Sequence, residues 1–356
     1  MTDSSTFTVA ASLAAALTVA TGVTQPLLIT VAKEFGLADP TAQLYMFFYY
    51  LGPASISMSI GCPCNKSYSD CNSSPTTTDL NENEWPSGRS LLYAAAIAAI
   101  DIFAQSLNYT GVSMSGPTIF AIIYSSVTIW TAVYSRLILQ RKLSMFQWMG
   151  VVTVFGGLTL TGLHSFQLGP QVFRGSCMIF VGSSIHALGY VVSELIMTRG
   201  KNRITVRANT AIQGLVACVA LAFWQLFYTR PRFMKLIREP MKQAGTSRQQ
   251  ALFVFLAIAF ANFIHALSFM YTLRHFPGGA VSAGVLKGLQ AVLVFLTTSA
   301  VFCGTDAGGE EMCFNLAKLL SLVVVVGGSL IYGKATEVQS KQQFNQKAGY
   351  EIVPDA

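Results

Sequence analysis

Two ionisable residues stand alone inside long apolar segments, and they offer the most specific chemistry in the sequence. Lys287 lies within the apolar run 278–303, and Asp101 lies within the run 90–110. Ionisable groups are expensive in lipid and usually face a polar cavity. We therefore expect Lys287 to hold an anionic group of a solute. A desolvated carboxylate can exchange a proton, so Asp101 is the predicted coupling residue, unless it binds a cationic substrate.

Both residues also have structural interpretations, which stay open at the level of the sequence. Lys287 could form an ion pair, with Asp101 as its partner, or could extend its ammonium group to the membrane interface. Asp101 could instead form a hydrogen bond to a neighbouring helix.

A polar stripe follows Asp101 along the same predicted helix. Gln105 and Asn108 lie four and seven residues after Asp101, which is helical spacing. In the next apolar run, Tyr124 offers a ring for a planar substrate, and Ser125 adds polarity, although serine also serves in helix–helix contacts. We predict that Gln105, Asn108, Tyr124 and Ser125 contribute to substrate binding.

Four other polar residues in the apolar runs are interpreted as structural. His186 and His265 each lack a second ligand at metal spacing, so we expect hydrogen-bonded side chains and no metal site. Tyr109 falls at a predicted span end and is assigned to the interfacial aromatic belt. Lys318 lies near the start of the last apolar run, from which its ammonium group can reach the interface. No cofactor is expected.

The elements that must position these residues are predicted to lie in a membrane. Of the 356 residues, 52% are hydrophobic and 11% are charged, whereas a soluble domain averages about 25% charged residues. Apolar residues come in runs with the charges between them, which is the pattern expected in lipid. The net charge is +7, but the basic residues cluster at the ends of the runs. We attribute them to membrane orientation and expect no nucleic-acid binding.

The hydropathy pattern predicts an all-α polytopic membrane protein of about ten transmembrane helices, each of about 20 mostly apolar residues. The third and fourth runs are separated only by the region 109–111, where we expect a tight turn. Gly111, Gly116 and Pro117 act as helix breakers in this part of the chain. The predicted spans are 7–32, 41–61, 90–110, 112–137, 144–164, 173–198, 208–229, 250–273, 278–303 and 314–333.

Lysine and arginine residues predict which side of the membrane each loop occupies. With a cytosolic N-terminus, 13 of them lie on the cytosolic side and 8 on the other side. Both termini are therefore predicted to be cytosolic. The expected location is an endomembrane of the Golgi/ER or vacuole-like type rather than the plasma membrane. The loop 230–249 dissents, because it holds six of those eight residues. The same orientation predicts that the sequons at Asn65 and Asn72 are unglycosylated.

Two cysteines flank a loop that the charge pattern places on the non-cytosolic side of the membrane. The residues between Cys303 and Cys313 include three acids and no lysine or arginine. Because a non-cytosolic compartment is oxidising, we predict a disulfide between these two cysteines.

A weak internal repeat relates distant apolar runs. Residues 104–110 (AQSLNYT) match residues 266–272 (ALSFMYT) at an offset of 162, and residues 154–157 (VFGG) match residues 325–328 (VVGG) at an offset of 171. We interpret the glycine pairs as helix-packing sites, because small residues let helix backbones approach closely.

This repeat predicts two halves of five spans each. The first half is 1–164, with a flexible loop at 62–89, the second is 173–333, and a polar cytosolic tail occupies 334–356. An odd number of spans per half inverts the second half relative to the first. Inverted repeats around a central site are the architecture of alternating-access carriers.

Two motifs carry a resemblance to a known family. Residues 132–144 (AVYSRLILQRKLS), followed by residues 147–150 (QWMG), look like the junction of the fourth and fifth spans of nucleotide-sugar transporters. Residues 286–289 (LKGL) look like their Lys-Gly motif in the ninth span. The sequence thus resembles the drug/metabolite transporter superfamily, whose members have ten spans in two inverted halves.

The resemblance has one departure. Tyr124 matches a tyrosine of the nucleotide-sugar transporters, but Ser125 stands at their glutamine and Val127 at a lysine that is expected to bind phosphate. Asp101 instead resembles the chloroquine-resistance-type branch. The superfamily is therefore better supported than either branch.

The resulting hypothesis is an alternating-access antiporter of an anionic metabolite such as a nucleotide sugar, with Lys287 as the anion contact. The alternative is a proton-coupled carrier of a cationic or neutral metabolite or drug, with Asp101 as the coupling residue. A membrane-embedded enzyme or receptor is a remote alternative, because no paired intramembrane acids, His-Glu-x-x-His helix or Ser-His pair is found. The expected partners are a small solute and the lipid bilayer, and a homodimer stays open.

Overall fold

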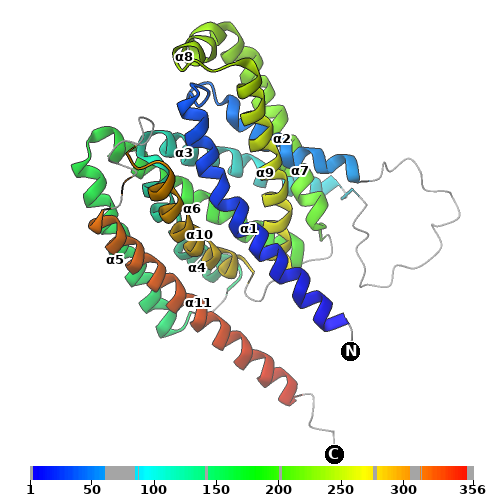
Figure 1. Cartoon of the computed structure of the whole chain (residues 1–356). Helices are drawn as coiled ribbons and strands as arrows, with labels where there is room; N and C mark the ends of the chain where they lie inside the picture. Colours follow the sequence, from blue (N-terminus) through cyan, green and yellow to red (C-terminus); the bar gives the residue numbers. More distant parts are fainter. Residues whose placement is uncertain are drawn as a thin grey trace, which may run out of the picture.

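The protein is helical throughout the part that the structure describes. The computed structural model describes residues 3–60, 85–86, 88–140, 143–199, 203–275, 279–304, 313 and 315–350, and these contain no strand. The long helices pack side by side into one bundle (Figure 1). The α-helices are α1 (Asp3–Glu34), α2 (Leu44–Ser55), α3 (Gly88–Tyr124), α4 (Val127–Ile138), α5 (Met145–Gln167), α6 (Pro170–Thr198), α7 (Val206–Trp224), α8 (Glu239–Gln243), α9 (Arg248–His275), α10 (Ala280–Val301) and α11 (Leu316–Tyr350).

Six of the described helices are long and apolar enough to cross a membrane by length and composition, and two shorter apolar helices cover Met145–Thr161 and Leu286–Val301. The chain is therefore a multi-pass helical membrane protein, as the hydropathy pattern predicted. Every predicted span overlaps a described helix, but α3 runs through the predicted span 90–110 and into 112–137. The count of ten crossings stays a prediction. The six are Ala10–Glu34, Gly88–Tyr124, Pro170–Thr198, Val206–Arg232, Arg248–His275 and Leu316–Thr336.

The predicted turn at residues 109–111 is wrong. Helix α3 continues through Gly111, and its backbone departs from helical geometry at Gly116, with φ 80° and ψ 163°. Pro117 explains the position, because proline disfavours helical geometry in the preceding residue and has no N–H to donate the helical hydrogen bond. Only glycine adopts this φ without strain. Gly111 stays helical and lets α6 approach, since a Cβ there would lie 2.8 Å from the Gly175 carbonyl oxygen.

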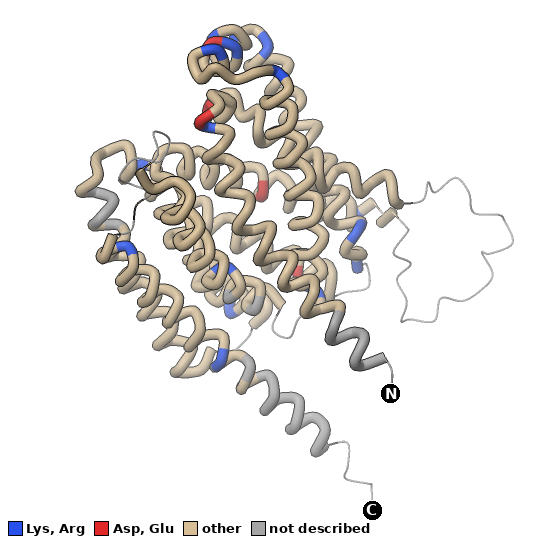
Figure 2. The backbone as a smooth tube through the Cα atoms, viewed as in Figure 1, with Lys and Arg blue, Asp and Glu red and all other residues tan. Residues whose placement is uncertain are grey.

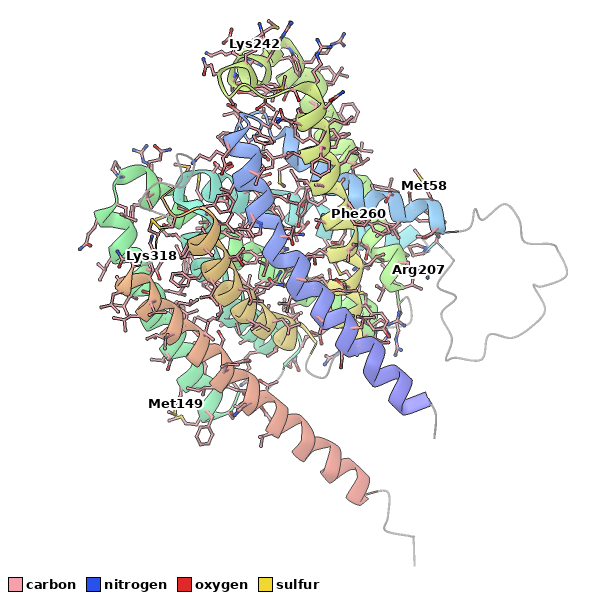
Figure 3. All side chains as sticks on the ribbon, viewed as in Figure 1. Met58, Met149, Arg207, Lys242, Phe260 and Lys318 are labelled. Atoms are coloured by element: carbon pink, nitrogen blue, oxygen red, sulfur yellow. A yellow bond between two sulfur atoms is a disulfide. The ribbon has the colours of Figure 1, made fainter. Side chains whose placement is uncertain are left out.

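Helices α5 and α11 pack against each other through glycine. A Cβ on Gly157 would lie 3.0 Å from the Ser321 carbonyl oxygen, and one on Gly328 would lie 2.8 Å from the Gly150 carbonyl oxygen. A Cβ on Gly156 or Gly327 would meet nothing within 4 Å. The packing interpretation is therefore confirmed for one glycine of each pair. The two helices run in opposite directions, with Met149 near the start of α5 and Lys318 near the start of α11 at opposite ends (Figure 3).

Other helix pairs complete the bundle. Helix α3 packs extensively on α6, α1 packs on α9, and α2 packs on both α7 and α9. Helix α10 contacts α1, α3, α4 and α11. These contacts hold α10, which carries Lys287, at the centre of the molecule.

The start of α1 and the end of α11 lie toward the same end of the bundle (Figure 1). Helix α11 extends beyond the predicted span into the polar tail, as far as Tyr350. The predicted disulfide between Cys303 and Cys313 is present. Lys318 is only 2% exposed, so the prediction that it extends to the interface is wrong. The sequons at Asn65 and Asn72 lie outside the described residues.

Candidate functional site

A cavity lies at the centre of the bundle, where both predicted halves meet. Its volume is about 80 Å³, and its lining comes from α1, α2, α3, α6, α7, α9 and α10. Helices separated widely in the sequence therefore contribute to one site. The charged and titratable lining residues are Asp101, His186, His265, Lys287, Tyr49, Tyr50, Tyr109, Tyr124 and Tyr190.

Lys287 is buried and faces aromatic rings. Its side chain comes from α10 and is 5% exposed. The ammonium nitrogen lies 5.5 Å from the centre of the Tyr124 ring and 5.2 Å from that of the Phe269 ring. These contacts are cation–π interactions. Among the described residues no carboxylate lies within ion-pairing distance of Lys287, so neither the pair with Asp101 nor an extension to the interface is seen.

Asp101 has two partners of its own. Its Oδ1 lies 3.0 Å from the His186 Nε2, and its Oδ2 accepts a hydrogen bond of 2.6 Å from the Tyr50 hydroxyl. His186 comes from α6, which packs on α3. Tyr50 comes from α2, which packs on α7 and α9. These contacts agree with the structural interpretation of Asp101, a hydrogen bond to a neighbouring helix.

A chain of hydrogen bonds leads from Asp101 toward Lys287. The His186 Nδ1 lies 2.8 Å from the Tyr124 hydroxyl, which lies 3.0 Å from the Tyr190 hydroxyl. A neutral imidazole that donates from Nε2 to Asp101 accepts at Nδ1 from Tyr124. The ring of Tyr124 is one of the two rings that face the Lys287 ammonium group. One hydrogen-bond network thus joins Asp101 to Tyr124, whose ring faces Lys287.

Amide side chains add neutral polarity to the same cavity. Gln105 donates a hydrogen bond of 3.0 Å to the Tyr49 hydroxyl, and Asn262 donates one of 2.7 Å to the Tyr49 carbonyl oxygen. Gln25 donates one of 2.7 Å to Asn262. His265 forms a 2.9 Å hydrogen bond with Thr21. These bonds tie α1, α2, α3 and α9 together around the cavity.

The structure brings four of the six predicted site residues together. Lys287, Asp101, Gln105 and Tyr124 line the cavity. Ser125 is fully buried and donates its hydroxyl to the Ile122 carbonyl oxygen at 2.6 Å, outside the lining.

Asn108, predicted to bind substrate, and Tyr109, assigned to the interfacial belt, both lie elsewhere than predicted. Asn108 also lies outside the lining, and it faces α6 at Gly182. Tyr109 is not a belt residue, because it is 3% exposed and lines the cavity. The error follows from the misplaced helix break: with α3 continuous through Gly111, Tyr109 lies within a helix rather than at its end.

Several cavity residues were not predicted to have a role there. His186 and Tyr50 complete the contacts of Asp101, and Tyr49 and Tyr190 extend the polar network. The signals in the sequence were a histidine, the Tyr49-Tyr50 pair and a single tyrosine inside apolar runs, but they did not show which helix face meets the cavity. Among the described residues no group of three metal-ligating side chains occurs.

Known proteins resemble the chain over much of its length. The EamA-like transporter family matches residues 11–163. Solute carrier family 35 member F6 of Mus musculus is 25% identical over 252 residues, 66% of this chain and 65% of that protein. The Homo sapiens protein of the same name is 24% identical over 252 residues, 66% of this chain and 64% of that protein.

The resemblance to the drug/metabolite transporter superfamily is confirmed. It rests on the EamA-like match and on the solute-carrier-35 relatives, so the similarities are to transporters rather than to enzymes. The matching region spans just under two thirds of the length of these curated relatives. A solved structure titled only as the crystal structure of a protein covers 89% of this chain and 98% of its own, at a TM-score of 0.48 and 13% identity. A likeness at that level does not establish a common fold.

Proposed function

We propose that the chain is an alternating-access carrier that exchanges small organic anions, such as a nucleotide sugar or another phosphorylated metabolite. The observation that carries this proposal is the buried ammonium group of Lys287, which faces two aromatic rings and no described carboxylate. A buried charge without a counter-ion is unfavourable by several kcal/mol. An anion that enters the cavity would offset this cost.

The state of Asp101 argues against a cationic substrate. Its carboxylate already receives hydrogen bonds from Tyr50 and His186. A hydrogen bond to a charged group contributes about 1.5–3 kcal/mol, so a cation would have to compete with both. The cavity therefore favours anions at Lys287.

The aromatic lining suits a planar group on the substrate. The Tyr109 and Phe120 rings are stacked with centres 6.5 Å apart, and those of Phe120 and Tyr124 are stacked at 4.9 Å. Aromatic pairs contribute about 0.5–1.5 kcal/mol beyond their buried area. A base or sugar that inserts beside these rings would gain similar contacts.

The size of the cavity requires movement. Its volume of about 80 Å³ is below the roughly 300–1,000 Å³ of pockets for drug-sized ligands. A nucleotide sugar would enter only after the surrounding helices separate. Alternating access is movement of this kind, in which one repeat rocks against the other around a fixed site.

The contacts of α5 with α11 support an inverted repeat. Gly157 meets Ser321 and Val325, whereas Gly328 meets Gly150 and Val154. Adding 171 to each α5 residue gives its counterpart in α11: 150 becomes 321, 154 becomes 325 and 157 becomes 328. Exchange of the helices thus maps this set of contacts onto itself. The same offset relates the glycine pairs in the sequence.

A proton-coupled carrier of a cationic or neutral solute is the second candidate. The hydrogen-bonded path through Asp101, His186 and Tyr124 favours it, because a proton bound at Asp101 or His186 would change the charge facing the cavity. Under this alternative, Asp101→Asn flattens the pH dependence of transport. An unchanged pH profile with intact transport would leave Asp101 with a structural role.

The two candidates are separated by a substrate screen. Purified protein is reconstituted in proteoliposomes, and uptake is measured for labelled sugar nucleotides, phosphorylated metabolites, amino acids and amines. Anion exchange predicts uptake of phosphorylated solutes that depends on a trapped internal anion. Uptake of amines driven by a pH gradient, without any anion exchange, would support the alternative instead.

A further inference from the structure

A second groove lies on the outer surface of the bundle, between α2 and the end of α7. Its volume is about 420 Å³, and it shares no lining residue with the central cavity. Apolar side chains make most of its wall, and one cation lies among them. The lining residues are Leu44, Phe47, Phe48, Ala222, Gln225, Leu226, Thr229, Arg230 and Phe233.

The walls of this groove are fixed by hydrogen bonds and ring stacking. Gln225 and Thr229 both donate to the Ala42 carbonyl oxygen, at 2.8 Å and 3.0 Å. These bonds attach the connection between α1 and α2 to the helical segment that follows α7. The Phe48 ring stacks on the Phe255 ring of α9, with centres 4.5 Å apart. The groove therefore exists before any ligand enters.

A π-helical turn sets the position of the Arg230 side chain. The turn Gln225–Thr229 (η4) is a π-helix, and the Arg230 N–H donates to the Gln225 carbonyl oxygen, five residues back. One extra residue in a turn rotates all following side chains by about 100° relative to a regular α-helix. Arg232 contacts Tyr228, with its guanidinium group 4.4 Å from the ring centre. Arg230 is exposed and lines the groove, and its guanidinium group has no hydrogen-bond acceptor among the described residues.

The surroundings indicate the level of lipid headgroups. Phe223 and Phe227 are 58% and 71% exposed, as expected of side chains in contact with acyl chains. Cations follow directly, since residues 230–249 hold six lysines and arginines and one acid, Glu239. They gather at the end of the molecule formed by α8 (Figure 2). Apolar surface thus gives way to positive charge at the groove.

We infer that this groove binds an anionic phospholipid, with one acyl chain along Phe47 and Leu226 and the phosphate on Arg230. A guanidinium group presents two parallel N–H donors, which suits phosphate oxygens. The inference also gives one cation of the 230–249 loop a role apart from membrane orientation. Of the six cations of this loop, the proposal concerns Arg230, the one that lines the groove.

The test is lipid retention by the purified full-length protein, measured by native mass spectrometry. Phosphatidylglycerol and phosphatidylcholine with identical acyl chains are supplied in equal amounts. The wild type is expected to retain phosphatidylglycerol preferentially, and Arg230→Gln to reduce this preference about fivefold. Lys242→Gln is the matched control, because Lys242 is an exposed cation of the same segment outside the groove (Figure 3).

A further variant separates the acyl chain from the charge. Leu226→Trp fills the groove and keeps every cation, so it should lower the retention of both lipids. An equal loss of preference in Lys242→Gln and Arg230→Gln would mean diffuse attraction and would overturn the site. Unchanged retention in Leu226→Trp would overturn it as well, as would displacement of the lipid by inorganic phosphate at millimolar concentration.

Discussion

Asp101 and Lys287 show what a single residue reveals in the sequence and what it does not. Both could be identified because an ionisable group inside an apolar run requires a polar environment. Their partners could not be predicted in the same way. His186 reaches Asp101 from α6, and Tyr50 reaches it from α2. Those contacts depend on which helix faces meet, and this cannot be read from a single sequence.

The pairing of Asp101 with His186 predicts an energetic coupling. Asp101→Asn and His186→Asn should each lower thermal stability in detergent, and the double variant should lose less than the sum. The expected coupling is about 0.5–3 kcal/mol, as for residues in direct contact. Asp101→Asn combined with His265→Asn is the control, because His265 bonds to Thr21 instead. Equal coupling in both cycles would argue against a specific pair.

Individual helices were more predictable than their ends. The existence of each long helix follows from apolar runs of membrane-spanning length. The break in α3 was misplaced because Gly111 and Gly116 are the same residue type with different surroundings. Gly111 packs against α6 within a helix, whereas Gly116 precedes Pro117 and takes a positive φ. Only the second situation forces the helix to deviate.

The contact between α5 and α11 gives a prediction with a neighbouring control. Gly328→Ala should destabilise the protein by about 1–3 kcal/mol, because the new Cβ would crowd the backbone of Gly150. Gly327→Ala adds the same methyl group in open space and should be neutral or stabilising by up to about 1 kcal/mol. Thermal unfolding in detergent measures both.

The inverted repeat extends this prediction to the other half. Gly157→Ala should cost about as much as Gly328→Ala, and Gly156→Ala should behave like Gly327→Ala. Comparable losses at Gly156 and Gly157 would show that the proposed symmetry of this contact does not hold.

The proposed orientation of the whole molecule rests on charge and on the disulfide. A Cys303–Cys313 bridge is expected in an oxidising compartment, and α11 leads from near this bridge to Tyr350. If α11 crosses once, the tail lies in the cytosol. The sequence predicts the same from its lysines and arginines. The loop 230–249 weakens this count with its six cations, of which Arg230 has a different proposed role.

Sealed microsomes test this orientation. A C-terminal tag should be digested by external protease, whereas the two bridged cysteines should react with maleimide only after permeabilisation and reduction. Glycosidase should leave the mass of the protein unchanged, as expected for cytosolic Asn65 and Asn72. A glycosidase-sensitive shift that Asn72→Gln removes would reverse the proposed topology.

The central claim for the whole molecule is anion exchange through Lys287, and trans-stimulated efflux tests it most directly. Proteoliposomes are loaded with a labelled sugar nucleotide or phosphorylated metabolite selected by the uptake screen, and its release is followed after the same unlabelled solute is added outside. External solute should accelerate release by the wild type and by Lys235→Ala, which removes an exposed cation away from the cavity. Lys287→Ala should reduce this exchange about a hundredfold, the equivalent of about 3 kcal/mol for a lost buried charge pair. Wild-type exchange of the anion by Lys287→Ala would contradict the claim.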